Sequence, residues 1–232
     1  MSVFIESLIQ ALKLIISFDG EVMSITLLSL KVSGFAVLLA TIIGLPLATI
    51  ISLNRFFAKR LIVNIIHTLM GFPPVVAGLL VYLVLSRNGP MGYLDILYSP
   101  AAMVIAQLIL AVPIITGVSI AAINSVPKQV KDTVVSLGAT KFQLVRKVII
   151  EARTGLITAV IAGFGAAISE VGAIIMVGGN IRFHTRALTT AIVLETRRGN
   201  FEMAMALGII LISLAFIVNY LLTWYQSQGV RR

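Results

Sequence analysis

Long apolar stretches, separated by short polar gaps, dominate the pattern of this chain. A membrane-spanning helix needs about 20 consecutive apolar residues. The stretches that meet this length are residues 25–53, 61–85, 101–123, 156–178 and 203–225. The pattern therefore predicts an all-α polytopic membrane protein with about five transmembrane helices.

Two of these spans contain residues that disturb a helix. Gly44 and Pro46 lie inside the first span, which is longer than the hydrocarbon layer and is expected to tilt or kink. Pro73 and Pro74 interrupt the second span, and each removes an N–H and frees a carbonyl one turn earlier. The resulting kink either shapes a pore or serves helix packing alone.

The first residues, 1–20, predict a helix of a different kind. Apolar residues there follow one helical stripe, with polar and charged residues off it, and the run is too short for a comfortable span. The stripe consists of Phe4, Ile5, Leu8, Ile9, Leu12, Ile15 and Ile16. We interpret residues 1–20 as an interfacial helix and residues 21–226 as one transmembrane domain, with a sixth span as the alternative for the first segment.

A charged insert, residues 124–155, separates the third and fourth spans. Its first part has apolar residues at helical spacing, and Gly138 stands where a helix end favours a left-handed residue. Thr140 and Gln143 then form a capping-box pattern that starts a second helix. The insert is interpreted as two short amphipathic helices hinged at Gly138-Ala139, which lie against the membrane or a partner protein. A solvated loop is the alternative.

Composition supports the membrane interpretation and excludes several other classes. The chain is 59% hydrophobic, its mean hydropathy is +1.05, and its formal charge is +9. The basic residues lie between apolar runs and form no continuous face, which argues against nucleic acid. With no cysteine and only two histidines, neither a thiolate nor a histidine metal site is expected, and no cofactor is expected.

The distribution of Lys and Arg predicts the orientation. Most of them fall in the 54–60 gap, the 124–155 insert and the C-terminal tail with Arg231 and Arg232. Positive residues favour the cytoplasmic side, so the N-terminus is expected outside and the C-terminus in the cytoplasm.

Two charged residues lie deep in spans. Lys31 is in the first span and Glu170, next to Ser169, is in the fourth, at nearly matching depths from the outer side. A lone charge in the membrane is costly, so we predict a Lys31–Glu170 pair near a gate. In the alternative, Lys31 extends to the surface while Glu170 meets Ser169, Arg182 or Arg186. The gate or pore candidates are Lys31, Pro73, Pro74, Ser169 and Glu170.

The loop of residues 179–202 carries arginines on the side that should hold few of them. They are Arg182, Arg186, Arg197 and Arg198, and they flank an apolar turn from Leu188 to Leu194. The turn is interpreted as a re-entrant helix capping a pore, with the arginines attracting an oxyanion or docking an acidic binding protein. Local pairing of the arginines with Glu195 and Glu202 is the alternative.

The insert resembles the cytoplasmic loop of ATP-binding-cassette (ABC) importer permeases. The family pattern runs Glu-Ala-Ala, three residues, Gly, and further on Ile-x-Leu-Pro. Gly138 takes the glycine position, whereas Asp132-Thr133-Val134 keep only the acidic character of the triplet and Ile150-Glu151 replace Leu-Pro. In that family the first short helix docks in a cleft of the ATPase subunit. The resemblance implies such coupling for Asp132, Thr133, Val134, Gly138 and Ala139.

The resemblance extends over almost the whole chain. Residues 70–92 and 162–201, with their Gly-Gly-Asn, His-Thr-Arg and Glu-Thr-Arg strings, are similar to permeases of the molybdate/tungstate branch, most closely the tungstate type. This implies a type I ABC importer permease fold in the cytoplasmic membrane. It also implies a homodimeric pore with alternating access, two copies of an ABC ATPase subunit and an extracytoplasmic substrate-binding protein. In this family selectivity lies mainly in the binding protein.

No phosphate-binding Walker A pattern occurs, since Gly138-Ala139-Thr140-Lys141 lacks its spacing, so the chain itself is not expected to be an enzyme. Two other interpretations remain open at this point. An ion-coupled secondary transporter would use Glu170 as a proton carrier, and a membrane scaffold would not transport at all. Co-purification with an ATPase subunit separates the importer from both.

Overall fold

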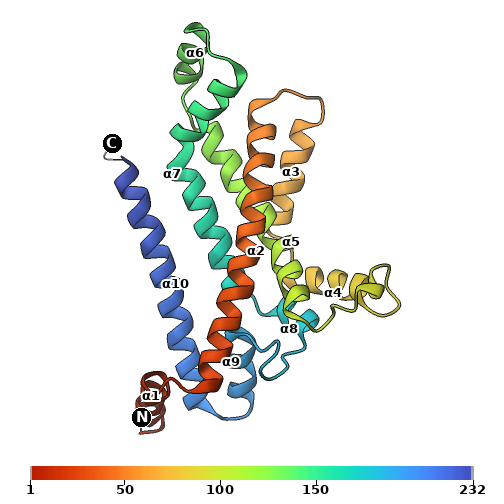
Figure 1. Cartoon of the computed structure of the whole chain (residues 1–232), viewed down its shortest axis with the longest axis vertical. Coiled ribbons are helices and arrows are strands. Elements are labelled where there is room, and N and C mark those ends of the chain that lie inside the picture. Colours follow the sequence, from red (N-terminus) through yellow and green to blue (C-terminus); the bar gives the residue numbers. More distant parts are fainter. Residues whose placement is uncertain (1, 231–232) are drawn as a thin grey trace.

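The computed structural model describes residues 2–230 and consists of helices over that range, without strands (Figure 1). Four helices, α2, α5, α7 and α10, are long and apolar enough to cross a membrane, and the bent pair α3–α4 makes a fifth if it counts as one span. The helices are α1 (Ser2–Ile16), α2 (Gly20–Leu53), α3 (Lys59–Met70), α4 (Pro74–Leu85), η1 (Gly92–Leu94), α5 (Pro100–Asn124), α6 (Lys128–Ser136), α7 (Lys141–Ile168), α8 (Gly172–Gly178), α9 (Leu188–Arg197) and α10 (Phe201–Val230). The all-α prediction is confirmed. Arg231 and Arg232 lie outside the described residues.

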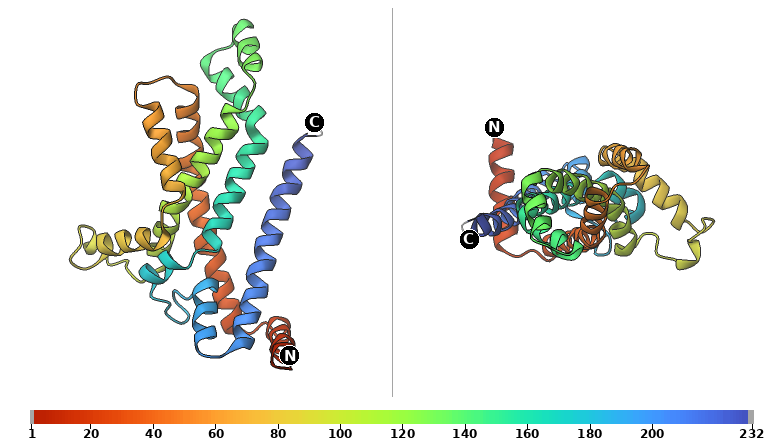
Figure 2. Two further views of the ribbon diagram at one scale, coloured as in Figure 1. Left: turned by 180° about the vertical axis from the view of Figure 1, so that it is seen from behind. Right: turned by 90° about the horizontal axis from the view of Figure 1, so that it is seen from above.

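Helix α2 packs along α5 at the centre of the bundle (Figures 1 and 2). Small buried residues recur at every fourth position of α2, namely Ala36, Ala40, Gly44 and Ala48. Such a stripe lets two helix backbones approach closely, which is how helices associate in lipid, where the hydrophobic effect does not drive them together. Helix α2 stays helical through Gly44 and Pro46, so Gly44 serves close packing rather than a break.

Replacing Gly44 with leucine is expected to force α2 away from α5. A Cβ at Gly44 lies 3.0 Å from Thr116 Oγ1 and 3.2 Å from Ile115 Cγ2, whereas a Cβ at Gly34, on the same helix, meets nothing within 4 Å. Overpacking a buried contact costs about 1–3 kcal/mol. The melting temperature in detergent should fall for Gly44→Leu and stay near the wild-type value for Gly34→Leu. Equal effects of the two substitutions contradict the packing role.

The second predicted span is not a straight helix. It divides into α3 and α4, which meet at an angle of 99°. Each has 12 residues, or about 18 Å at 1.5 Å per residue, well short of a bilayer core of about 30 Å. Pro73 caps α4 and Pro74 begins it, where a missing N–H costs nothing. The proline pair therefore ends one helix and starts another, and α4 projects sideways from the bundle (Figure 1).

The insert between the third and fourth spans differs from the prediction in its second half. Helix α6 is short, Gly138 has a positive φ of 78°, and the Thr140–Gln143 capping box is present, as expected. The second helix, however, is not short. It is the first part of α7, which runs for 28 residues into the membrane region, because no glycine or proline interrupts residues 141–154.

Helix α1 packs across the start of α10 (Figure 2). Ser7 and Ala11 are buried in this contact. The side chains of Ile5, Ile9, Leu12 and Ile16 are exposed and form an apolar stripe on the opposite face. A helix with this arrangement suits the membrane interface, which remains the prediction for residues 1–20.

Candidate functional site

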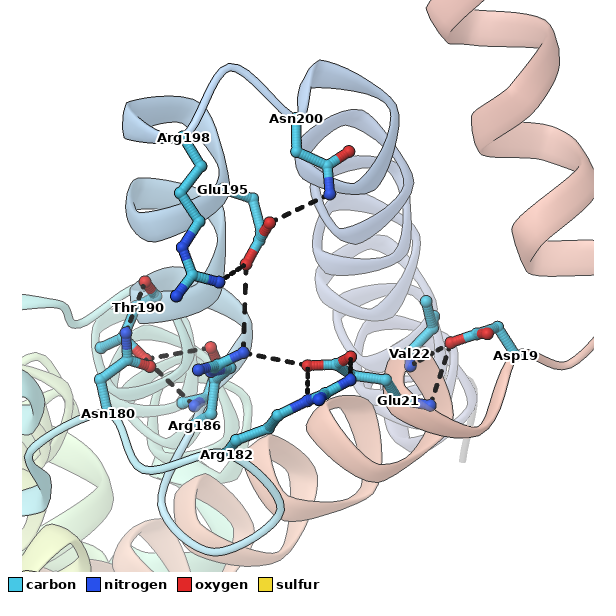
Figure 3. A network of polar contacts seen from close by, with 11 residues as sticks. Asp19, Glu21, Val22, Asn180, Arg182, Arg186, Thr190, Glu195, Arg198 and Asn200 are labelled. Carbon is cyan, nitrogen blue, oxygen red and sulfur yellow. Dashed lines mark hydrogen bonds and ion pairs between the residues drawn. The ribbon is translucent and has the colours of Figure 1, made fainter.

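A salt-bridge cluster, defined as Glu21, Arg182, Arg186, Glu195 and Arg198, lies at the end of the bundle that holds α1 and α9 (Figure 3). Glu21 lies in the first turn of α2, two residues after the capping residue Asp19, which accepts hydrogen bonds from the N–H groups of Glu21 and Val22. Arg182 donates two hydrogen bonds to the Glu21 carboxylate, at 3.0 Å from Nε and 2.6 Å from Nη2. Arg186 donates a third, at 2.9 Å.

Glu195 is the second acid of the cluster. It accepts hydrogen bonds from Arg198 at 3.2 Å and from the Asn200 amide at 3.1 Å, and it lies 4.0 Å from Arg186. The side chains of Arg186 and Glu195 are only 8% and 9% exposed. Arg186 therefore joins two acids at the buried centre of the cluster, while Arg182 and Arg198 close it on the exposed sides.

Threonine and asparagine side chains fix the loop that carries these arginines. The Thr185 hydroxyl accepts from the N–H of Ile181 at 3.0 Å and donates to the carbonyl of Gly178. The Thr190 hydroxyl donates to the Asn180 side chain at 3.0 Å. Ser29 on α2 accepts the N–H of Leu188 at 2.8 Å, which attaches the start of α9 to α2. The arginines are thus presented by a shaped loop rather than by a solvated segment.

The cluster favours local pairing over free arginines around a mouth. The predicted pairing with Glu195 is confirmed for Arg198, but Glu202 instead accepts from the amide of Gln10. Glu21 was not anticipated as the main acid. Hydrogen bonding to Glu21 raises the pKa of Arg182 above its usual value, so this guanidinium stays charged. Arg197 is exposed and has no ion pair within residues 2–230.

An open cavity of ≈ 550 Å³ adjoins the cluster. Its walls carry both signs of charge, since three arginines face four acids there. The lining residues are Leu14, Asp19, Glu21, Arg182, Arg186, Glu195, Arg198, Asn200, Glu202 and Met203. A cavity wall with similar numbers of positive and negative side chains does not concentrate anions. The prediction that all four arginines attract an oxyanion therefore has little support from this geometry.

A second cavity, of ≈ 300 Å³, lies where two helices break, and we call it the inter-break cavity. One break is the turn between α3 and α4, and the other separates α7 from α8. Two of the predicted gate residues, Pro74 and Glu170, line it. The lining residues are Leu69, Met70, Gly71, Phe72, Pro74, Gln107, Leu110, Ala111, Ile114, Ala166, Ala167 and Glu170.

The predicted Lys31–Glu170 pair is not formed. No ion pair joins them in the described part of the chain, and Lys31 is exposed on the side of α2 that faces away from the core. Glu170, only 9% exposed, instead accepts the N–H of Ala173 at 2.9 Å and so caps α8. Similar depths in the membrane do not bring Lys31 and Glu170 together, because successive residues of a helix point 100° apart. In this part of α2 the inward-pointing residues are Val32 and Ser33, so Lys31 points outward.

Two further contacts hold the α7–α8 break. The hydroxyl of Thr189 on α9 donates to the carbonyl of Glu170 at 2.7 Å. The amide of Gln107 on α5 donates to the carbonyl of Ala167 at 2.7 Å and to the Ser33 hydroxyl at 3.2 Å. Ser169 bonds within its own turn, to the carbonyl of Gly165. Gln107, which is 1% exposed, was missed, although a glutamine inside an apolar span is a visible signal.

The tip formed by α6 and the start of α7 exposes most of the predicted coupling residues. Asp132, Thr133 and Gly138 are exposed, whereas Val134 and Ala139 are half-buried against the rest of the tip. Apolar side chains also project there: Val135 is 56% exposed, Leu137 81% and Phe142 77%. Exposed apolar side chains gathered at one place are typical of surfaces that contact another molecule, so the coupling role of this tip stays a prediction.

Comparison with known proteins identifies the family. A family model described as the binding-protein-dependent transport system inner membrane component matches residues 14–231. The chain belongs to this family. It is therefore a multi-pass permease of an ABC importer, which works with an ATPase subunit and a substrate-binding protein and is not itself catalytic.

Two relatives of this permease have names that refer to anion or tungstate transport. It is 46% identical over 203 residues to a probable anion ABC transporter permease protein of Haloferax volcanii, covering 85% of this chain and 88% of that protein. It is 37% identical over 218 residues to the tungstate uptake system permease protein TupB of Peptoclostridium acidaminophilum, covering 94% of this chain and 96% of that protein.

The fold of the permease also matches a solved importer. A chain of the MetNI methionine ABC transporter, in an inward-facing conformation, superposes with a TM-score of 0.75 over 92% of this chain and 98% of that chain. The sequences are 17% identical, so this likeness speaks for the fold alone. The predicted type I importer permease architecture is confirmed.

Proposed function

We propose that this permease imports tungstate, and that it does so as a homodimer with two copies of an ABC ATPase subunit and an extracytoplasmic binding protein. The single observation that carries the choice of substrate is the 37% identity, over nearly the full length, to a tungstate uptake permease. Discrimination among tungstate, molybdate and sulfate falls to the binding protein. The exposed Arg197, which has no ion pair within the described residues, offers the binding protein a positive contact beside the salt-bridge cluster.

The coupling tip gives this proposal a mechanism. Helix α7 is continuous from the tip to Ile168, a length of about 42 Å for its 28 residues. Its far end is the α7–α8 break at the inter-break cavity. When ATP binding closes the two ATPase subunits, a tip docked on each moves with it. A rigid α7 carries that displacement directly to the pathway, and access alternates.

We expect the second copy of the chain to pack against the exposed side of α3 and α4. None of the residues of α3 is buried, and α4 exposes large apolar side chains along its length. These are Val75, Val76, Leu79, Leu80, Leu83 and Val84. We keep the orientation with the N-terminus outside and the α6 tip in the cytoplasm, since the insert is rich in Lys and Arg.

The test is ATP-driven uptake in liposomes that contain the permease, its ATPase subunit and the binding protein. Tungstate accumulation, measured by mass spectrometry, should require both ATP and the binding protein, and the ATPase should co-purify with the permease. Molybdate and sulfate serve as competitors. Uptake that follows an ion gradient without ATP indicates a secondary transporter, and the absence of both uptake and co-purification indicates a scaffold.

A further inference from the structure

The two helix breaks lie next to each other, where α4 packs against α8. Helices α4 and α8 touch so closely that a Cβ at Gly78 lies 2.7 Å from the Cα of Ala173. Non-helical backbone at membrane depth is tolerated only where protein buries it or where it lines a water-filled cavity. Both breaks line the inter-break cavity.

Glu170 dominates the electrostatics of this cavity. Among the residues that line it, Glu170 has the only ionisable side chain. Its carboxylate accepts one backbone N–H, from Ala173, and no Lys, Arg or His within the described residues lies within 4 Å of it. Because the other walls are apolar apart from Gln107, nothing nearby cancels the negative field inside the cavity.

A negative wall is unexpected in the pathway of an anion importer. At an effective dielectric constant of about 20, two like charges about 6–12 Å apart repel strongly enough to lower the occupancy by a small anion about tenfold to a hundredfold. The effect is larger for a divalent oxyanion. As long as the carboxylate faces the cavity, it opposes the passage of anions in either direction.

We propose that Glu170 is the anion barrier of the resting permease, and that it prevents the leak of oxyanions and smaller anions while α4 and α8 are packed together. This inference rests on the proposed role of the chain as a pore. Glu170 follows directly on the end of α7, and Thr189 of α9 holds its carbonyl. Displacement of α7 by the coupling tip therefore moves the carboxylate relative to α4 and relieves the barrier.

The experiment measures passive efflux from liposomes that contain the purified permease and no ATP. Vesicles loaded with iodide, tungstate and rubidium separate an electrostatic barrier from a general leak. Glu170→Gln keeps an oxygen that accepts the Ala173 N–H but removes the charge. Iodide efflux should rise about tenfold over the wild type, with a larger rise for tungstate and none for rubidium.

A second substitution keeps the inference testable if Glu170→Gln does not fold. Ala166 lines the same cavity, and Ala166→Lys offsets the carboxylate without touching the cap of α8. It should raise iodide efflux well above that of the size-matched Ala166→Gln, again without a rise for rubidium. The barrier is overturned if iodide efflux of the folded variants matches the wild type, or if iodide and rubidium rise together.

The outcome is independent of the uptake experiment. Efflux is measured without ATP, ATPase or binding protein, so a permease that fails ATP-driven tungstate uptake can still show the charge-dependent barrier. Conversely, normal ATP-driven uptake together with unchanged iodide efflux in both substituted permeases contradicts the proposed role of Glu170 and leaves the proposed function intact.

Discussion

Replacing Glu21 with glutamine should lower the stability of the permease more than any other change in the salt-bridge cluster. Arg186 is nearly buried, with an Nε that has no hydrogen-bond partner, and without Glu21 it keeps only Glu195 at 4.0 Å. Removing one partner of a buried pair costs about 3 kcal/mol or more, because the remaining charge is left without compensation. Thermal unfolding of the purified permease in detergent measures the loss.

The exposed arginine of the same cluster supplies the control. The Arg182 side chain is 61% exposed, so Arg182→Gln should cost no more than about 1 kcal/mol. The double substitution Glu21→Gln with Arg186→Gln leaves no buried charge without a partner and should recover part of the loss, since Arg182 is exposed to solvent. If Glu21→Gln and Arg182→Gln were equally mild, the cluster would be a solvated surface feature rather than a clamp between α2 and the 179–187 loop.

Replacing Gly138 with valine should uncouple ATP hydrolysis from the oxyanion while leaving the fold intact. The φ of 78° at Gly138 is a conformation that β-branched residues resist, at a cost of about 1–2 kcal/mol. A Cβ there meets nothing within 4 Å, so the penalty is conformational and local to the hinge. The ATPase rate of the assembled importer, with and without oxyanion-loaded binding protein, should lose its stimulation.

Asparagine at the same position is the matched control. Asparagine tolerates left-handed backbone better than other residues with a Cβ, so Gly138→Asn should retain most of the stimulation. Equal stimulation in the wild type and in Gly138→Val shows that the hinge has no part in coupling. A large fall in melting temperature for Gly138→Val contradicts the local character of the penalty.

Local signals in the sequence predicted local structure well. The Thr140–Gln143 capping box and the left-handed Gly138 depend on a few neighbouring residues and are present as expected. Hydropathy located the long apolar helices for the same reason, since burial in lipid is a property of the segment itself. The predicted fourth span, residues 156–178, was nevertheless wrong at its end, because α7 stops at Ile168 and α8 is a separate short helix. Hydropathy did not reveal the direction of α4, because an apolar segment has the same hydropathy whether it crosses the membrane or runs at an angle to the neighbouring spans.

Long-range pairing was the part that the sequence did not reveal. Glu21 and Arg182 are 161 residues apart, and nothing local to either residue indicates the other. The Lys31–Glu170 prediction failed because depth was considered without the rotation of α2, which turns Lys31 outward. The continuity of α7 could have been predicted from the sequence, because no glycine or proline interrupts the helix before Gly155. The charged residues in its first half were instead interpreted as a separate short helix.

The close crossing of α4 and α8 has a consequence for how the chain matures in the membrane. Gly78 is synthesised long before Ala173, so the contact that holds α4 at right angles to α3 does not yet exist when residues 59–85 leave the ribosome. At that moment residues 59–85 already carry the proline break, but nothing yet fixes the direction of α4. We therefore expect the angle between α3 and α4 to be set late in biogenesis, after α8 has been synthesised.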